Sequence, residues 1–93
     1  MEQELRQTLI KVLRCAKQRK PVGDAYELLV QDGHSVATIN TAVDILHDED
    51  CIDEFLIGQT KEDEFKLGWR LTWNGVEMMG KLGDEERRIG FQI

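Results

Sequence analysis

Residues 65–72 constrain the fold of this chain more than any other segment. Large apolar residues alternate strictly there with smaller or polar ones, at Phe65, Leu67, Trp69 and Leu71. Successive side chains of a strand point to opposite faces, so this period of two predicts a strand with one buried face. Phe55 and Ile57 predict a shorter strand before it. The intervening residues 59–63 are polar and of hairpin-loop length, so the two strands are predicted to form an antiparallel β-hairpin.

The chain before the hairpin has helical periodicity. A first helix is predicted from the apolar stripe Leu5, Leu9, Val12, Leu13 and Ala16, and it must stop at Lys20 because Pro21 cannot continue it. Asp24 stands at capping-box distance from Glu27, which predicts a short second helix that ends at Gly33. Ser35 is placed to cap a third helix over residues 35–48. Its buried side is marked by Ile39, Ala42, Val43 and Leu46.

A last, short helix is predicted after the hairpin. It begins at Thr72 or at Asn74 and ends before Gly83. Its apolar residues recur at a spacing of three, at Trp73, Val76, Met79 and Leu82. The order of elements is therefore helix, helix, helix, hairpin, helix. This is a mostly α chain with a β-hairpin, in the α+β class, with one domain over residues 1–83.

Residues 84–93 are predicted to form a C-terminal tail. The tail is charged for five residues and then alternates Ile89, Phe91 and Ile93 with smaller or polar residues. This alternation predicts a strand or arm that docks on a second copy of the chain, on its own domain or on a foreign partner. A frayed terminus with incidental apolar residues is the alternative.

Two stretches of the sequence resemble winged helix-turn-helix proteins. Residues 24–52 resemble the helix-turn-helix of winged-helix regulators. Residues 69–79, WRLTWNGVEMM, resemble the passage aromatic-x-Leu-Thr-x-x-Gly that closes the wing, where the threonine caps the last helix. The chain is also similar to small phage- and prophage-encoded winged-helix proteins of unassigned function. The resemblance implies that residues 35–48 are the recognition helix and residues 59–65 the tip of the wing.

The charge of the chain is unevenly distributed. Its net charge is −6, yet residues 1–20 hold six basic residues against two acidic ones. Residues 21–64 hold twelve acidic residues against Lys61 alone. A pI near 4.8 argues against a general polyanion binder, and the predicted recognition helix contains no Lys or Arg.

A transcription regulator that contacts DNA, as a dimer, is the leading interpretation of this sequence. Phosphates would be bound by basic residues of the first helix and the hairpin, and base edges by polar residues of the third helix. The candidate DNA-binding residues are Lys11, Arg14, Lys17, Thr38, Asn40, Thr41, Lys61, Lys66 and Arg70.

A regulator or inhibitor that binds another protein and not DNA is the alternative. Its acidic block would imitate the charge of DNA or occupy the basic cleft of a partner, as an anti-repressor or host-factor binder does. The candidate protein-binding residues are Asp44, Asp48, Glu49, Asp50, Ile89, Phe91 and Ile93. A structural assembly component is a third possibility.

Catalytic, metal and cofactor sites are not expected. No nucleophile-base arrangement or phosphate loop is evident, and His34 and His47 have no cysteine at ligand spacing, so both are predicted at the surface or its boundary. Cys15 and Cys51 are expected as reduced residues at the edge of the core. Trp69 and Trp73 are both expected to pack in the core. With no small-molecule ligand, signal segment or membrane span evident, a cytoplasmic protein is expected.

Overall fold

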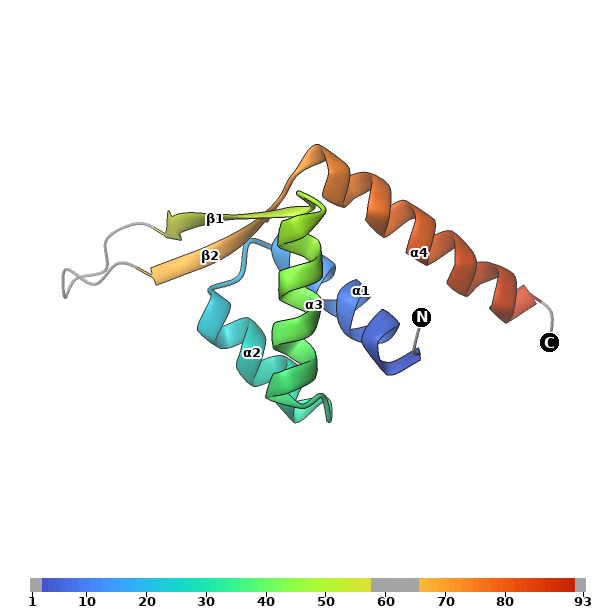
Figure 1. The fold of residues 1–93 in the computed structure, drawn as a ribbon, viewed down its shortest axis with the longest axis horizontal. Helices are drawn as coiled ribbons and strands as arrows, with labels where there is room; N and C mark the ends of the chain where they lie inside the picture. Colours follow the sequence, from blue (N-terminus) through green and yellow to red (C-terminus); the bar gives the residue numbers. More distant parts are fainter. Residues whose placement is uncertain (1–2, 58–65, 92–93) are drawn as a thin grey trace.

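Within the residues that the structure describes, the chain forms four helices and a two-stranded antiparallel sheet in the predicted order. The computed structural model describes the backbone of residues 3–57 and 66–91, and the side chains of residues 3–57 and 66–83. The elements are α1 (Gln3–Lys17), α2 (Val22–Gln31), α3 (Val36–Asp48), β1 (Ile52–Ile57), β2 (Lys66–Leu71) and α4 (Trp73–Phe91). In Figure 1 the hairpin and α4 extend in opposite directions from a body made of α1, α2 and α3.

Helix α1 is the centre of the hydrophobic core. Its predicted stripe is confirmed, since Leu5 is half-buried and the other four residues are buried. The helix packs against α2, α3, β2 and α4. Val12 and Leu13 are completely buried, and burial of each such side chain stabilises the fold by about 1.5–3 kcal/mol. The other elements are therefore held in place mainly by one face of α1.

The connection between α1 and α2 is attached to β2. Helix α1 ends at Lys17, and Arg19 then adopts a left-handed backbone conformation with φ of 55°. The Lys20 carbonyl accepts a hydrogen bond from the Trp69 N–H at 3.2 Å, and Pro21 forms an antiparallel bridge with Gly68. The basic end of α1 consequently lies beside the middle of β2.

Helices α2 and α3 form the helix-turn-helix. Helix α2 begins at Val22, so the predicted start at Asp24 is wrong: Pro21 occupies the N-cap position, where its fixed φ suits the residue before a helix, and no side chain caps the helix. Gly33 has φ of 95°, which confirms it as the left-handed residue that ends the turn. Ser35 Oγ accepts the Thr38 N–H at 3.1 Å, which confirms the predicted cap of α3.

The hairpin pairs β1 with β2 over six residue pairs, and its two faces differ. On one face, Trp69 is buried and packs against the Tyr26 ring at a centroid distance of 5.8 Å. Toward the tip, the same face carries Leu56 directly opposite Leu67, and both are exposed. The predicted burial is therefore correct at Trp69 and wrong at Leu67, because the strands project beyond the helical body there (Figure 1). Phe65 lies outside the described residues.

Helix α4 begins where the Leu-Thr-x-x-Gly motif predicts. Thr72 Oγ1 accepts the Gly75 N–H at 3.1 Å and donates to the Asp50 carbonyl at 2.5 Å. The Thr72 N–H also bonds the Cys51 carbonyl at 3.1 Å. A Cβ built on Gly75 would lie 2.0 Å from the Cys51 carbonyl oxygen. The motif thus fastens the start of α4 to the turn between α3 and β1, and only glycine fits that contact.

Two predictions for the C-terminal part are wrong. Helix α4 continues to Phe91, so it crosses the expected end at Gly83, and the strand-like backbone expected at Ile89 and Phe91 is helical instead. Residues 85–88 are two Glu and two Arg, which are good helix formers, and no proline interrupts them, so the helix propagates. The Ile89 and Phe91 side chains, and Ile93 altogether, lie outside the described residues, and docking by this segment stays a prediction.

Trp73 is also misplaced by the sequence prediction. It is 79% exposed, whereas Leu82 is buried on the same helix. Each residue turns the helix by about 100°, so residues spaced three apart drift around its axis. Over nine residues the helix makes about two and a half turns, which leaves a net offset of about half a turn. Trp73 and Leu82 therefore lie on opposite sides of α4, and only the latter reaches the core.

Candidate nucleic-acid interface

The three polar residues of α3 that were predicted to contact bases have hydrogen-bond partners within the chain. The Thr38 hydroxyl lies 2.8 Å from Ser35 Oγ, and Thr41 Oγ1 donates to the Ala37 carbonyl at 3.0 Å. Asn40 Oδ1 accepts the Tyr26 hydroxyl at 2.6 Å. Asn40 and Thr41 are exposed and Thr38 is half-buried, and base contact by these three residues stays a prediction.

The bond from Tyr26 limits what Asn40 can recognise. An asparagine reads adenine with both halves of its amide, because its NH₂ donates to N7 and its oxygen accepts from N6. In this structure the oxygen already accepts one hydrogen bond from the Tyr26 hydroxyl, which fixes the orientation of the amide and leaves the oxygen one acceptor position. Burial raises the pKa of Tyr26, and the charges of Asp44 and Glu54 raise it further, so this phenol remains a donor. Base readout through Asn40 is therefore limited to the amide orientation that the Tyr26 bond sets, unless that bond breaks.

The C-terminal half of α3 and the strand that follows are acidic. The four predicted acidic residues are all exposed: Asp44, Asp48, Glu49 and Asp50. Glu54 of β1 continues this surface and pairs with His47 at 3.2 Å. Residues 21–57, which comprise α2, α3 and β1, contain nine acidic residues and no Lys or Arg. The field over the helix-turn-helix consequently repels phosphates.

Two of the predicted phosphate-binding residues are engaged in the fold. Arg70 donates to Asp53 Oδ2 at 2.6 Å, and this hydrogen bond holds the pKa of the Asp53 carboxyl below its usual value. Lys11 lies 2.9 Å from His34 Nε2 and 3.4 Å from Asp32 Oδ2. Lys11 is therefore a structural residue, and Arg70 has its charge partly neutralised on the surface.

His34 is buried, so the prediction of a surface position is wrong. An ammonium group has no acceptor, so His34 Nε2 accepts from Lys11 and its Nδ1–H donates to Thr8 Oγ1 at 3.1 Å. The Thr8 hydroxyl in turn donates to the Glu4 carbonyl at 2.8 Å. The chain of bonds ties the turn between α2 and α3 to α1. No motif in the sequence signals it, because its members lie 23 and 26 residues apart along the chain.

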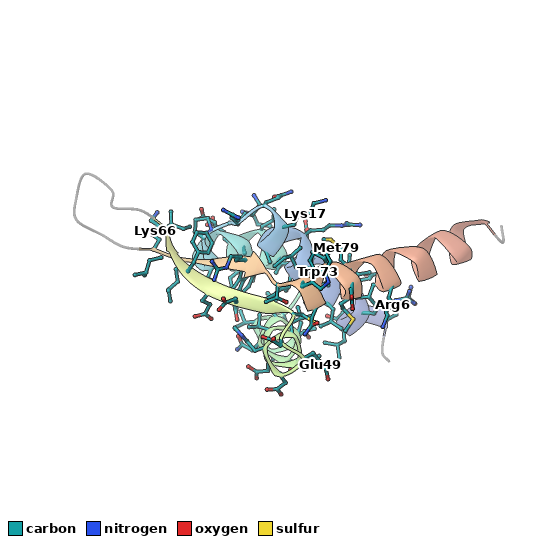
Figure 2. The ribbon with its side chains drawn as sticks, turned by 90° about the horizontal axis from the view of Figure 1, so that it is seen from above. Arg6, Lys17, Glu49, Lys66, Trp73 and Met79 are labelled. Atoms are coloured by element: carbon teal, nitrogen blue, oxygen red, sulfur yellow. The ribbon has the colours of Figure 1, made fainter. Side chains whose placement is uncertain are left out.

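Four of the other described cations lie at the end of α1, in the α1–α2 connection and on β2. We use the name basic band for Lys17, Arg19, Lys20 and Lys66. The Lys20 carbonyl bonds the N–H of Trp69, and Lys66 lies two residues beyond Gly68 toward the hairpin tip. Figure 2 shows Lys17 and Lys66 toward one edge of the molecule and Glu49, the residue after α3, at the other. The structure therefore does not bring the predicted phosphate-binding and base-contacting residues onto one face.

Arg14 and Lys17 also line a groove between α1 and α4. The groove measures about 700 Å³, and its apolar lining comes from Ile10, Val76 and Met79. Val76 is exposed on the same helix as Trp73. No pattern in the sequence indicates this groove, because the side of α4 that faces α1 depends on where Gly75 docks. Lys61, the predicted cation of the wing tip, lies outside the described residues.

Both cysteines are buried, and burial raises the pKa of each thiol. In the part of the chain that the structure describes, no three His, Cys, Asp or Glu side chains are grouped closely enough to hold a metal ion. No helix among the described residues is long and apolar enough to span a membrane.

Comparison with known proteins identifies the fold. No protein-family model matches the chain, and no curated protein matches it. The chain is similar to the X-ray structure of a PadR-like transcription factor from Bacteroides fragilis, with a TM-score of 0.66 and 14% sequence identity. The match covers 92% of this chain and 84% of the other. The chain has a winged-helix fold. The similarity to phage- and prophage-encoded winged-helix proteins stays a prediction.

Proposed function

We propose that this winged-helix protein is a non-enzymatic transcription regulator that binds DNA. The observation that carries the proposal is the fold itself, which is shared over nearly the whole chain with a structure described as a transcription factor. A helix-turn-helix followed by a β-hairpin is an architecture that places a helix and a wing against a duplex.

The charges assign the phosphate contacts to the basic band and not to α3. Phosphate binding supplies most of the non-specific affinity of such proteins and requires Lys, Arg or backbone donors. Helix α3 offers no cation, whereas Lys17 and Lys66 are exposed on the opposite side. Few phosphates are neutralised by so small a set, so affinity is modest and depends only weakly on salt.

Fluorescence anisotropy with a labelled mixed-sequence duplex at low salt tests this proposal. The double variant Lys17→Glu, Lys66→Glu is expected to bind at least tenfold more weakly, and to reduce the slope of log affinity against log salt by about 2. The control Lys81→Glu makes the same charge change as each single substitution, at an exposed site on α4 away from the basic band, and should stay within twofold of the unmodified protein. Absence of binding at low salt, with a native tryptophan spectrum, would refute DNA binding.

Binding of another protein in place of DNA is a second candidate function. The observation that favours it is the acidic surface of α3 and β1, which includes Asp44, Asp48, Glu49 and Asp50. Capture of a cellular partner that survives nuclease treatment, together with no DNA binding at low salt, would support this function over the first. Loss of every captured protein after nuclease treatment would contradict it.

Self-association through α4 is a further part of the proposal. Trp73 and Val76 are exposed beside the α1–α4 groove, and the helix continues past the body to Phe91. Exposed large apolar residues on one helix face favour a symmetric dimer. Light scattering is expected to show a dimer that becomes a monomer when residues 84–93 are deleted or when Trp73 is replaced by Ser. A monomer at all concentrations would refute the dimer.

A further inference from the structure

The outer half of the hairpin carries an apolar pair that the fold leaves uncovered. Leu56 of β1 and Leu67 of β2 are direct partners in the register, and they are 61% and 49% exposed. A cross-strand pair of this kind is normally covered by a helix or by a second sheet. Among the described residues neither a helix nor a second sheet covers it, because the hairpin projects past the helical body (Figure 1).

The surroundings of this pair are acidic. The next register pair on the same face, toward the helical body, is Glu54 with Trp69. The Trp69 ring packs against the Tyr26 ring. Glu54 pairs with His47 of α3, and the charges of both Asp44 and Glu54 act on Tyr26. The two leucines therefore lie at the outer end of a continuous surface with the acidic side of α3.

The chemistry of this surface does not suit a duplex. Leucine side chains make no bond to phosphate, and carboxylates repel it. It suits a protein segment that combines positive charge with a large apolar side chain, since an apolar contact rimmed by opposite charges provides both affinity and orientation. Charge complementarity is strong here, because no Lys or Arg occurs among residues 21–57.

We propose that the surface between α3 and the wing, formed by Asp44, Glu54, Leu56 and Leu67, is a docking site for a basic protein segment with an apolar anchor. Leu56 and Leu67 receive the anchor, and the two carboxylates receive the Lys or Arg residues beside it. The proposal rests on the second candidate function only in that it requires a protein partner, and it does not require that DNA binding be absent. It is compatible with DNA binding by the basic band on the opposite side.

Selection from a random library of short displayed peptides, with the full chain immobilised, tests the proposal without knowledge of the natural partner. The selected peptides are expected to combine two or more Lys or Arg residues with a large apolar one. Their affinity should fall at least tenfold for the variant Leu56→Ser, Leu67→Ser, and at least fivefold for Asp44→Asn, Glu54→Gln. The control Val30→Ser removes an equally exposed apolar side chain from α2 and should change the affinity less than twofold.

Backbone amide shifts of the isotope-labelled protein locate the bound peptide. Shifts centred on β1, β2 and α3 support the proposal, and shifts centred on α1 or α4 overturn it. Selection of acidic peptides, selection of none, or unchanged affinity for the leucine variant also overturns it. Far-ultraviolet circular dichroism confirms that each variant is folded.

The same variants separate this inference from the proposed functions. The leucine variant should bind duplex DNA within twofold of the unmodified protein, because the phosphate contacts are assigned to the basic band. If that variant loses both peptide and DNA binding while folded, the surface is a DNA-binding surface and the docking proposal is wrong. If peptide binding behaves as expected and DNA binding is absent, only the DNA function fails.

Discussion

The contact between Gly75 and the turn before β1 allows a sharp test of how this fold is assembled. In the structure, a Cβ on Gly75 would lie 2.0 Å from the Cys51 carbonyl oxygen and 2.7 Å from Leu71 Cδ2. Real Cβ atoms do not approach a backbone oxygen so closely, so Gly75→Ala forces the start of α4 away from the turn. That movement breaks the two bonds that Thr72 makes to the carbonyls of Asp50 and Cys51.

The expected magnitude follows from these contacts. Overpacking of a rigid site costs about 1–3 kcal/mol, and each lost hydrogen bond costs about 1 kcal/mol. The gain in helix propensity from Gly to Ala is about 1 kcal/mol, so Gly75→Ala is expected to destabilise the protein by about 2–4 kcal/mol. Gly23→Ala is the matched control, because Gly23 is an exposed helix residue whose Cβ would meet open space. It should leave the stability unchanged or raise it by up to about 1 kcal/mol.

Urea denaturation followed by tryptophan fluorescence measures both changes. Trp69 is buried near the affected turn and reports global unfolding. A thermal melt should show a midpoint lower by about 10 °C or more for Gly75→Ala, since about 1 kcal/mol corresponds to about 4–8 °C in a domain of this size. A stability of Gly75→Ala equal to that of the control would refute the close contact and with it the facing of α4.

Three further predictions concern single side chains. Leu46→Ala should lower the free energy of unfolding by about 2–5 kcal/mol and Thr41→Ala by little, because only the former leaves a cavity; urea denaturation that ranks them in reverse would mean that α3 is rotated. Thr72→Ala should lower the free energy of unfolding by about 1–2 kcal/mol and Asn74→Ala should leave it almost unchanged. Equal losses of stability in the same assay would mean that Thr72 is not the cap of α4. His34→Ala should cost about 2–4 kcal/mol, since one neutral and one charged hydrogen bond are lost; a loss below about 1 kcal/mol would show that the buried bonds to α1 contribute little.

The candidate site was only partly accessible from the sequence. The face of α3 that carries Asn40 and Asp44 followed from its helical period and is confirmed. The hydrogen-bond partner of Asn40 could not be predicted from the sequence, because Tyr26 lies on another helix and reaches Asn40 only after α2 packs against α3. Likewise, the sequence placed Lys11 among the phosphate ligands, and the fold instead uses it to bond His34.

The sequence by itself determined the order and type of the elements as far as residue 83. Periods of two and of 3.6, the stop at Pro21, the Ser35 cap and the Leu-Thr-x-x-Gly motif are local signals, and local geometry needs no information from distant residues. Tertiary structure alone decided that Trp73, Leu56 and Leu67 remain exposed, that His34 is buried, and that the basic band lies opposite the acidic surface. Each of these depends on which faces of separate elements meet. A period gives the spacing of side chains along one element, whereas exposure is set by contacts between residues far apart in the chain.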